Sequence, residues 1–256
     1  MIRREGNADW KQSAFPYNQH SLFLNLRFAR GYRAGRRAIG SRKVERHMGF
    51  SYPVDTMLDT RFVKVFDLRY APGRHYYNAT RRSLDRLPAG MESEAFERML
   101  PDAVSCCVVL HEHGKEDRMV LNREYRYPLG RTVISVPAGL IDPEDGGGSR
   151  EEAILSAAGR ELYEETGLRL TERDTVTMLN PCLFSSPGLT DESNAMVRVD
   201  LYGHDVSEMN QCHADVTEKF EGFFLAGKED ALRLMKEGIV STYTWIGLAA
   251  FLWEMR

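Results

Sequence analysis

The stretch "SREEAILSAAGRELYEETGL", residues 149–168, carries the strongest structural signal in the sequence. Its Ala, Leu and Glu content favours a helix. Ser149 suits the N-cap position, and Glu152 follows at the spacing of a capping box. Gly167 suits the left-handed position that commonly follows the last helical turn. The pattern therefore predicts a helix over about residues 150–165.

Three carboxylates crowd the end of this helix, where they are electrostatically unfavourable. Glu161 and Glu165 lie one turn apart on one face, with Glu164 beside them. Such a like-charge pair costs about 0.2–0.5 kcal/mol, and negative charge near a helix C-terminus costs about 0.3–1 kcal/mol more. Arg160 offsets part of this through Glu164, four positions on. The alternatives are a solvated acidic face and a site for a hard cation such as Mg²⁺; the uncompensated repulsion favours the cation.

Elements on both sides of this helix predict an α/β fold. The segments 61–70 and 75–82 flank a Pro-Gly turn and predict a β-hairpin, followed by a polar connector with helical character at 88–102. Helices are expected at 228–237 and 242–254. Strands interleaved with helices are typical of a layered α/β domain. Further strands are predicted at 104–111, 118–124, 132–136, 176–184, 195–202 and 219–226.

The amino-acid composition limits the classes of protein to which this chain can belong. The longest apolar runs fall far short of the roughly 20 residues that cross a bilayer, so no membrane span is expected. Four cysteines without Cys-x-x-Cys spacing indicate free thiols in a reducing compartment, which favours a cytoplasmic location. Residues 1–50 hold eleven Lys and Arg against three Asp and Glu. We interpret this segment as a flexible or peripheral extension, in preference to a nucleic-acid-contacting arm.

The string Gly146-x5-Glu152-x7-Arg160-Glu161-Leu162-x-Glu164-Glu165-x-Gly167-Leu168 resembles the 23-residue motif of the Nudix hydrolases at every fixed position. The resemblance implies the Nudix fold, a mixed β-sheet sandwiched between α-helices, here with an N-terminal β-hairpin subdomain. It also implies Mg²⁺-assisted hydrolysis of a nucleoside diphosphate linked to another group. The expected organisation is a basic extension at 1–55, the hairpin and connector at 56–100, and a Nudix hydrolase domain at 101–256.

The resemblance also implies roles for the helical residues. Glu161 and Glu165 would be the main ligands of Mg²⁺, with Mn²⁺ as a substitute. Glu164 would help to hold the metal or Arg160, and Gly167 would end the helix. The string "VPAGLID", residues 136–142, is similar to a turn of one subgroup in which an alanine carbonyl, here that of Ala138, binds the metal.

The position of the first acidic residue of the motif is ambiguous. Counted from Gly139 of that turn, the spacing falls on Asp145 instead of Glu152, so the two compete for the role. Nine residues separate Glu152 from Glu161, a rotation of about 900°, which places them on opposite helix faces. We therefore assign Glu152 to capping and interpret 146–152 as part of an insertion.

Stretches outside the motif look like the ADP-ribose pyrophosphatase subgroup. In "REYRYPLG", residues 123–130, Arg126 would hold the diphosphate. In "SSPGLTDE", residues 185–192, Glu192 would contact the terminal ribose, and Gly188 and Asp191 belong to the same substrate-binding loop. One departure is a serine, Ser135, near the position where the subgroup often has a glutamate. The aromatic residues that could contact adenine are Tyr125, Tyr127 and Phe184, which the sequence does not rank.

The catalytic base would come from a loop before the last strand, within "DVTEKFEGFFLA", residues 215–226. Glu218 is the first choice and Glu221 the second, with Glu164 as a further catalytic candidate. The predicted protein is a homodimeric, Mg²⁺-dependent pyrophosphatase in which the hairpin packs or exchanges across the two-fold axis. It would cleave ADP-ribose or a relative to AMP and a sugar phosphate. The alternatives are hydrolysis of another dinucleotide or nucleoside diphosphate derivative, capped RNA included, and a non-catalytic ADP-ribose-binding Nudix sensor.

Overall fold

The larger sheet of the protein is mixed and holds seven strands among the described residues. The structure is a computed structural model that describes residues 49–146, 148–209 and 220–254. The strands run in the order β10-β5-β4-β9-β8, with β6 beside β5 and β7 beside β4. Their bounds are β4 Ala103–His111, β5 Arg118–Arg126, β6 Arg131–Ser135, β7 Ala138–Leu140, β8 Thr175–Phe184, β9 Ser193–Tyr202 and β10 Phe220–Ala226.

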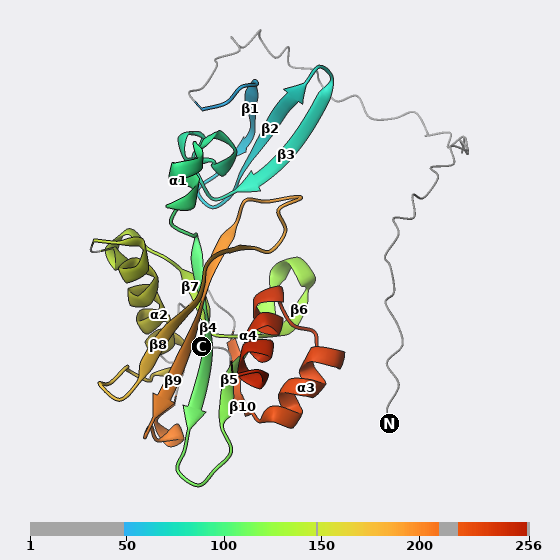
Figure 1. Cartoon of the computed structure of the whole chain (residues 1–256). Coiled ribbons are helices and arrows are strands. Elements are labelled where there is room, and N and C mark those ends of the chain that lie inside the picture. Colours follow the sequence, from blue (N-terminus) through green and yellow to red (C-terminus); the bar gives the residue numbers. More distant parts are fainter. Residues whose placement is uncertain (1–48, 147, 210–219, 255–256) are drawn as a thin grey trace, which may run out of the picture. The chain divides into compact units, whose positions relative to one another are not determined.

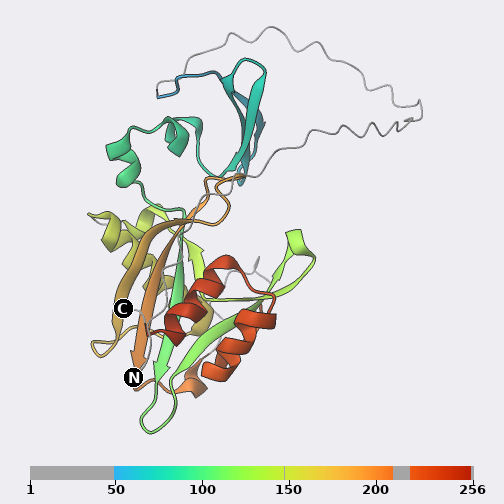
Figure 2. The same cartoon turned by 45° about the vertical axis from the view of Figure 1, so that its right-hand side comes forward.

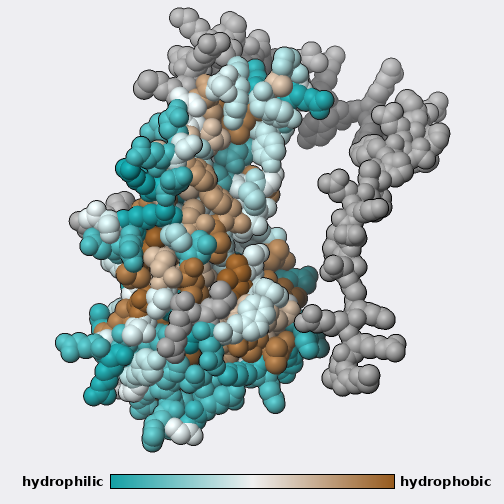
Figure 3. Space-filling model, viewed as in Figure 1, coloured by the Kyte–Doolittle hydropathy of each residue, from teal (hydrophilic) through white to brown (hydrophobic). Residues whose placement is uncertain are grey.

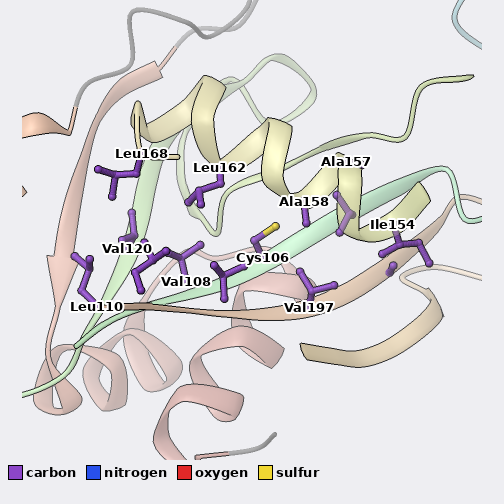
Figure 4. Close-up of a cluster of buried hydrophobic side chains, with 14 of the residues drawn as sticks. Cys106, Val108, Leu110, Val120, Ile154, Ala157, Ala158, Leu162, Leu168 and Val197 are labelled. Atoms are coloured by element: carbon purple, nitrogen blue, oxygen red, sulfur yellow. The ribbon is translucent and has the colours of Figure 1, made fainter. Parts of the chain in front are cut away.

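Helices cover both faces of this sheet (Figures 1 and 2). On one face lies α2, Arg150–Thr166, whose Leu162 belongs to the same apolar cluster as Val108 and Val197 of the sheet (Figure 4). On the other face lie α3, Lys228–Glu237, and α4, Thr242–Leu252, over a second cluster that includes Met119 and Leu248. This arrangement confirms the predicted fold class, a mixed sheet sandwiched between helices.

The predicted helix is present, with both of its expected ends. Ser149 accepts a hydrogen bond from the backbone N–H of Glu152, whose side chain accepts one from the Ser149 N–H, which completes the capping box. Gly167 adopts a left-handed conformation with φ 76° and donates its N–H to Tyr163. Glu152 is exposed, as expected of a capping residue. The helix is therefore fixed at both ends by local interactions.

A short strand that the sequence did not reveal begins within the Pro-Ala-Gly turn. It places this turn beside the C-terminal end of α2. Strand β7 pairs antiparallel with β4, so that Ala138 lies opposite Ser105 and Leu140 opposite Ala103. On its other side β4 pairs in parallel with β9, which places Asn194 beside Ala103. The strand was missed because three residues around a Pro-Ala-Gly turn lack the alternation that marks a strand.

A second, smaller sheet precedes the seven-stranded sheet along the chain. It consists of β1, Val54–Asp59, β2, Lys64–Ala71, and β3, Arg74–Thr80, paired antiparallel in that order. The last two form the predicted hairpin, and β1 was not anticipated. The connector contains a 3-10 turn, Pro88–Gly90, and one α-helix, α1, Ser93–Glu97. The boundaries proposed at residues 55 and 100 stay predictions, and most of the basic extension lies outside the described residues.

Surface character differs along the face shown in Figure 3. Hydrophobic residues gather across its middle, whereas its lower end is mostly hydrophilic. The lower end corresponds to the turn between β4 and β5 (Figure 1). Among the helices of the described part of the chain, none combines the length and apolar character that crossing a bilayer requires.

Candidate active site

The two carboxylates that the sequence placed on one helix face point inward. The exposed fraction is 7% for Glu161 and 3% for Glu165, so the solvated acidic face is excluded for this pair. Buried carboxylates are rare unless they are paired with cations or hydrogen-bond donors. Their burial at the end of α2 therefore identifies this region as the candidate site.

Hydrogen bonds hold Glu165 against the sheet. Asn122, on β5, donates its side-chain N–H to one carboxylate oxygen, and the backbone N–H of Ala138 donates to the other at 3.3 Å. Burial raises the pKa of the nearby Cys106 thiol, and the negative charges of Glu165 and Glu161 raise it further. Both carboxylates therefore lie close enough to Cys106, on β4, to influence its thiol.

Arg160 is the cation that holds this end of the site together. Its guanidinium donates to Asp145 at 2.8 and 3.1 Å, to Glu161 at 2.7 Å, to Glu164 at 3.2 Å and to the carbonyl oxygen of Leu140 at 2.7 Å. The contact with Glu164 was expected from the sequence, and those with Asp145 and Leu140 were not. Arg160 therefore links the helix to the segment that follows β7.

These contacts decide between the two candidates for the first acidic residue of the motif. Asp145 is buried and bound to Arg160, whereas Glu152 only caps the helix. Burial by itself would raise the pKa of Asp145, but hydrogen bonds from Arg160 and from the backbone N–H of Asp142 outweigh it and hold the pKa below its usual value. Asp145 is therefore the carboxylate that the arginine uses.

The donor atoms at this end fit a hard divalent cation in kind. They are oxygens of Glu161, Glu165 and Glu164, together with the carbonyl of Ala138, and Mg²⁺ and Mn²⁺ prefer such ligands. Within the described residues, no three His, Cys, Asp or Glu side chains already surround one point closely enough to hold a metal. Arg160 contacts two of these carboxylates, Glu161 and Glu164, and offsets part of their charge.

Gly139 provides a sharp test of this geometry. A Cβ atom at this position would overlap the carboxylate of Glu161, so the absence of a side chain is what allows the helix to approach the turn. Gly139→Ala is expected to displace Glu161 and to lower the activity of the protein about tenfold or more, by analogy with the loss of supporting groups at metal sites. Gly227→Ala, at the residue before α3, is the matched control, because an added Cβ would meet only Glu116 there, at ordinary van der Waals distances. Equal activity of the two variants would contradict the proposed role of Glu161.

A cavity of about 520 Å³ opens beside the Ala138–Gly139 turn. Of the predicted substrate-binding residues, Arg126 and Glu192 line it; Arg126 pairs with Glu124 at 2.7 Å, and Glu192 with Arg81 at 3.1 Å. Burial raises the pKa of Glu124, and Arg126 offsets part of that rise. The other lining residues include Ser105, Ser135, Ala138, Gly139, Asn194 and Tyr243.

Two residues of the loop after β8 lie elsewhere. Gly188 is exposed and does not line the cavity. Asp191 is turned toward Arg82, 3.9 Å away, in a largely buried position that raises its pKa, and it does not line the cavity either. The loop itself is tied to the smaller sheet, because the N–H of Ala79 donates to the carbonyl of Leu189 at 3.1 Å. The substrate-binding roles of Gly188 and Asp191 stay predictions.

The candidates for the catalytic base are divided between described and undescribed parts of the chain. Glu218 lies outside the described residues. Glu221 lies in β10, is exposed and does not line the cavity. Glu164 is partly exposed and bound to Arg160. The assignment of the base therefore stays a prediction.

Several residues of the site were missed by sequence reasoning. Asn122 and Glu124 lie in a predicted strand, but nothing in their local pattern marks them as site residues. Arg81 comes from the hairpin, far from the motif in sequence. Tyr243 is an aromatic residue of the cavity lining, whereas Tyr125, Tyr127 and Phe184 are not among the lining residues. Only the long-range pairing of strands and helices brings these side chains together.

Comparisons with known proteins agree with this geometry. The family profile described as NUDIX domain matches residues 99–248. A Caenorhabditis elegans protein described as a nudix hydrolase is 37% identical over 121 residues, which cover 47% of this chain and 49% of the relative. An ADP-ribose pyrophosphatase of Saccharomyces cerevisiae is 33% identical over 101 residues, or 39% of each chain. The chain thus spans half or less of the length of these two relatives.

A bacterial relative is matched over more of its length. An ADP-ribose pyrophosphatase of Bacillus subtilis is 30% identical over 150 residues, which cover 59% of this chain and 71% of the relative. The matched region of the family profile contains α2, the turn before it and most of the strands that form the cavity.

Proposed function

The chain belongs to the Nudix domain family, and from this premise we propose that it hydrolyses the diphosphate bond of ADP-ribose or a related nucleoside diphosphate sugar. The products would be AMP and a sugar phosphate. The observation that carries the proposal is the buried pair Glu161 and Glu165, which lies against the Ala138–Gly139 turn; that turn, Arg126 and Arg81 line one cavity. Carboxylates behind this turn and guanidinium groups in the cavity wall suit a substrate that is bound through a metal ion and through its phosphate oxygens.

Each residue of the site has a part in this proposal. Glu161, Glu165 and the carbonyl of Ala138 would hold Mg²⁺, with Mn²⁺ as a substitute. The chemistry that such a cation supplies is neutralisation of diphosphate charge and a lower pKa of the attacking water. Arg126 would bind diphosphate oxygens, and Glu192 would contact the terminal ribose.

Proton transfer completes the reaction. Water attacks phosphorus, the bridging P–O bond breaks, and one phosphate keeps the bridging oxygen as it leaves. Glu218 is proposed to take the proton of the attacking water, with Glu221 as the second candidate and Glu164 as a further one. Asp145 and Arg160 take no part in the chemical step. They position other residues, because Arg160 fixes Glu161 and Glu164 relative to the turn.

A substrate panel with product identification tests the activity. Purified protein is incubated with ADP-ribose, other nucleoside diphosphate sugars, dinucleoside polyphosphates and capped RNA, in Mg²⁺, in Mn²⁺ and in excess chelator. The expected result is AMP and ribose 5-phosphate from ADP-ribose, dependent on the metal. Preferential cleavage of a dinucleotide or of capped RNA would show that this compound, and not ADP-ribose, is the substrate. Tight binding of ADP-ribose without turnover would instead support a sensor.

We propose further that the protein is a homodimer that packs through its smaller sheet. The sheet β1–β3 and its turns expose many large apolar side chains, an unusual concentration for a free surface. Light scattering after size exclusion should give twice the 29.2 kDa mass of one chain, and Tyr77→Asp should shift the mass toward that of a monomer. A monomeric wild-type protein would contradict the proposal. The exposed residues are Met57, Leu58, Phe62, Val63, Tyr70, Tyr76 and Tyr77.

A further inference from the structure

The sheet contributes three small polar side chains to the wall of the cavity, and a fourth, Ser241, caps α4. Those of the sheet are Ser105 on β4, Ser135 on β6 and Asn194 on β9, with exposed fractions of 1%, 4% and 7%. The next residues on the same faces of β4 and β9, Cys107 and Met196, belong to the apolar cluster beneath α4. The change from apolar to polar therefore coincides with the cavity.

Two of these side chains have buried oxygens that the fold leaves unpaired. The hydroxyl of Ser135 and the carboxamide oxygen of Asn194 have no hydrogen-bond partner within the described ranges 49–146, 148–209 and 220–254. An unpaired buried polar group costs free energy, so it calls for a reason such as a bound ligand. The fold does satisfy the adjacent Ser193, whose hydroxyl contacts Asp102 and Arg82.

Charge is distributed unevenly around the cavity. Arg126 and Arg81 each lie in an ion pair with a carboxylate, and the turn at Ala138 leads to the buried acids. Ser135 and Asn194 are neutral, and the oxygen of Asn194 can only accept hydrogen bonds. An acceptor oxygen repels a phosphate and suits an uncharged group that carries a donor. The cavity thus offers different surroundings to the charged and uncharged parts of a nucleotide.

We propose that Asn194 and Ser135 form a specificity subsite that accepts a hydrogen bond from the uncharged part of the substrate. The donor would be either a sugar hydroxyl or the exocyclic amine of a purine. The inference rests on the proposed function, because it assumes that the phosphates lie toward the arginines and the acidic end of α2. A site built to hydrogen-bond a donor rejects analogues that lack it, since the buried acceptor then stays unpaired.

Calorimetric binding of AMP, IMP and ribose 5-phosphate in chelator tests the subsite without relying on turnover. Asn194→Leu is expected to weaken binding by about tenfold, because one buried hydrogen bond is lost. If Asn194→Leu weakens the binding of AMP but not that of IMP, which lacks the amine, then the amine is the donor. Weaker binding of ribose 5-phosphate, or of AMP and IMP alike, identifies a hydroxyl. Unchanged affinities for all three, or a wild-type protein that binds none, would overturn the subsite.

Thermal unfolding without ligand separates recognition from a structural role. Asn180 is the matched control, because its carboxamide oxygen accepts a hydrogen bond from the N–H of Cys182 at 2.8 Å and it does not line the cavity. Asn180→Leu should lower the unfolding temperature, whereas Asn194→Leu should leave it unchanged or raise it, since no partner is lost. Equal destabilisation by the two variants would show that Asn194 serves the fold.

The same variants keep this inference apart from the proposed hydrolysis. A wild-type protein that cleaves ADP-ribose but binds its fragments no better than Asn194→Leu would refute the subsite and leave the activity intact. A protein that discriminates the fragments through Asn194 but cleaves no diphosphate sugar would refute the activity and leave the subsite intact. Ser135→Ala should weaken the same ligand as Asn194→Leu; a change for a different ligand would overturn their shared role.

Discussion

Glu165→Gln is expected to lower the turnover of ADP-ribose by at least about a hundredfold, because a neutral amide replaces a charged ligand at a site whose chemistry depends on metal binding. The substitution preserves size, and the side chain can still accept the hydrogen bond from Ala138. The second hydrogen bond is compromised, because an amide N–H would face the side-chain N–H of Asn122. Steady-state rates at saturating Mg²⁺ give the measurement, and circular dichroism checks the fold.

Glu151→Gln is the matched control for this substitution. Glu151 lies on the same helix but is exposed in its first turn, far along the chain from the buried pair. Its neutralisation should leave turnover within about twofold, in keeping with the small effects of most surface changes. If Glu165→Gln keeps the activity of Glu151→Gln, the assignment of Glu165 as a metal ligand is wrong.

Arg160→Ala is expected to destabilise the protein by about 3 kcal/mol, because removal of one partner leaves a buried charge uncompensated. The stranded groups would be Asp145 and Glu161, with exposed fractions of 8% and 7%, and the carbonyl of Leu140 would lose its donor. For a chain of this size, such a loss lowers the unfolding temperature by about 6–12 °C. Urea or thermal unfolding measures it directly.

The surface pair Arg98 and Glu94 provides the control for Arg160→Ala. It is a mostly exposed i,i+4 contact, so Arg98→Ala should cost less than about 1 kcal/mol. The depressed pKa of Asp145 adds a pH signature: its stabilisation is present above the unfolded value near 3.8 and is lost as the pH falls through the lower folded value. Similar stability of the two variants at neutral pH would contradict the role of Arg160.

The sequence predicted the structural features that depend on interactions between residues close together along the chain. The ends of α2 follow from Ser149, Glu152 and Gly167, each of which acts within one turn, and the structure confirms all three. The opposite placement of Glu152 and Glu161 followed from helix geometry alone. Six of the seven strands described in the larger sheet were visible because their apolar side chains recur in runs between turn residues.

Interactions between distant segments were beyond this reasoning. Neither Asn122 nor Arg81 belongs to a local pattern that reveals Glu165 or Glu192 as its partner. Three-residue β7 is too short to show periodicity, although it sets the position of Ala138 against α2. The polar character of Asn194 acquires meaning only when β9 pairs with β4 and places it in the cavity wall.

Asp145 binds Arg160 and Glu152 caps the helix, and this difference affects how related sequences should be aligned. The fixed spacing of the motif places Glu152 at its first acidic position, although Glu152 caps the helix and Asp145 makes the contact with Arg160. Related sequences should be aligned with a seven-residue gap after Asp145, so that residues 146–152 fall in the insertion. Roles carried over through the uncorrected spacing would assign the contact with Arg160 to the wrong carboxylate.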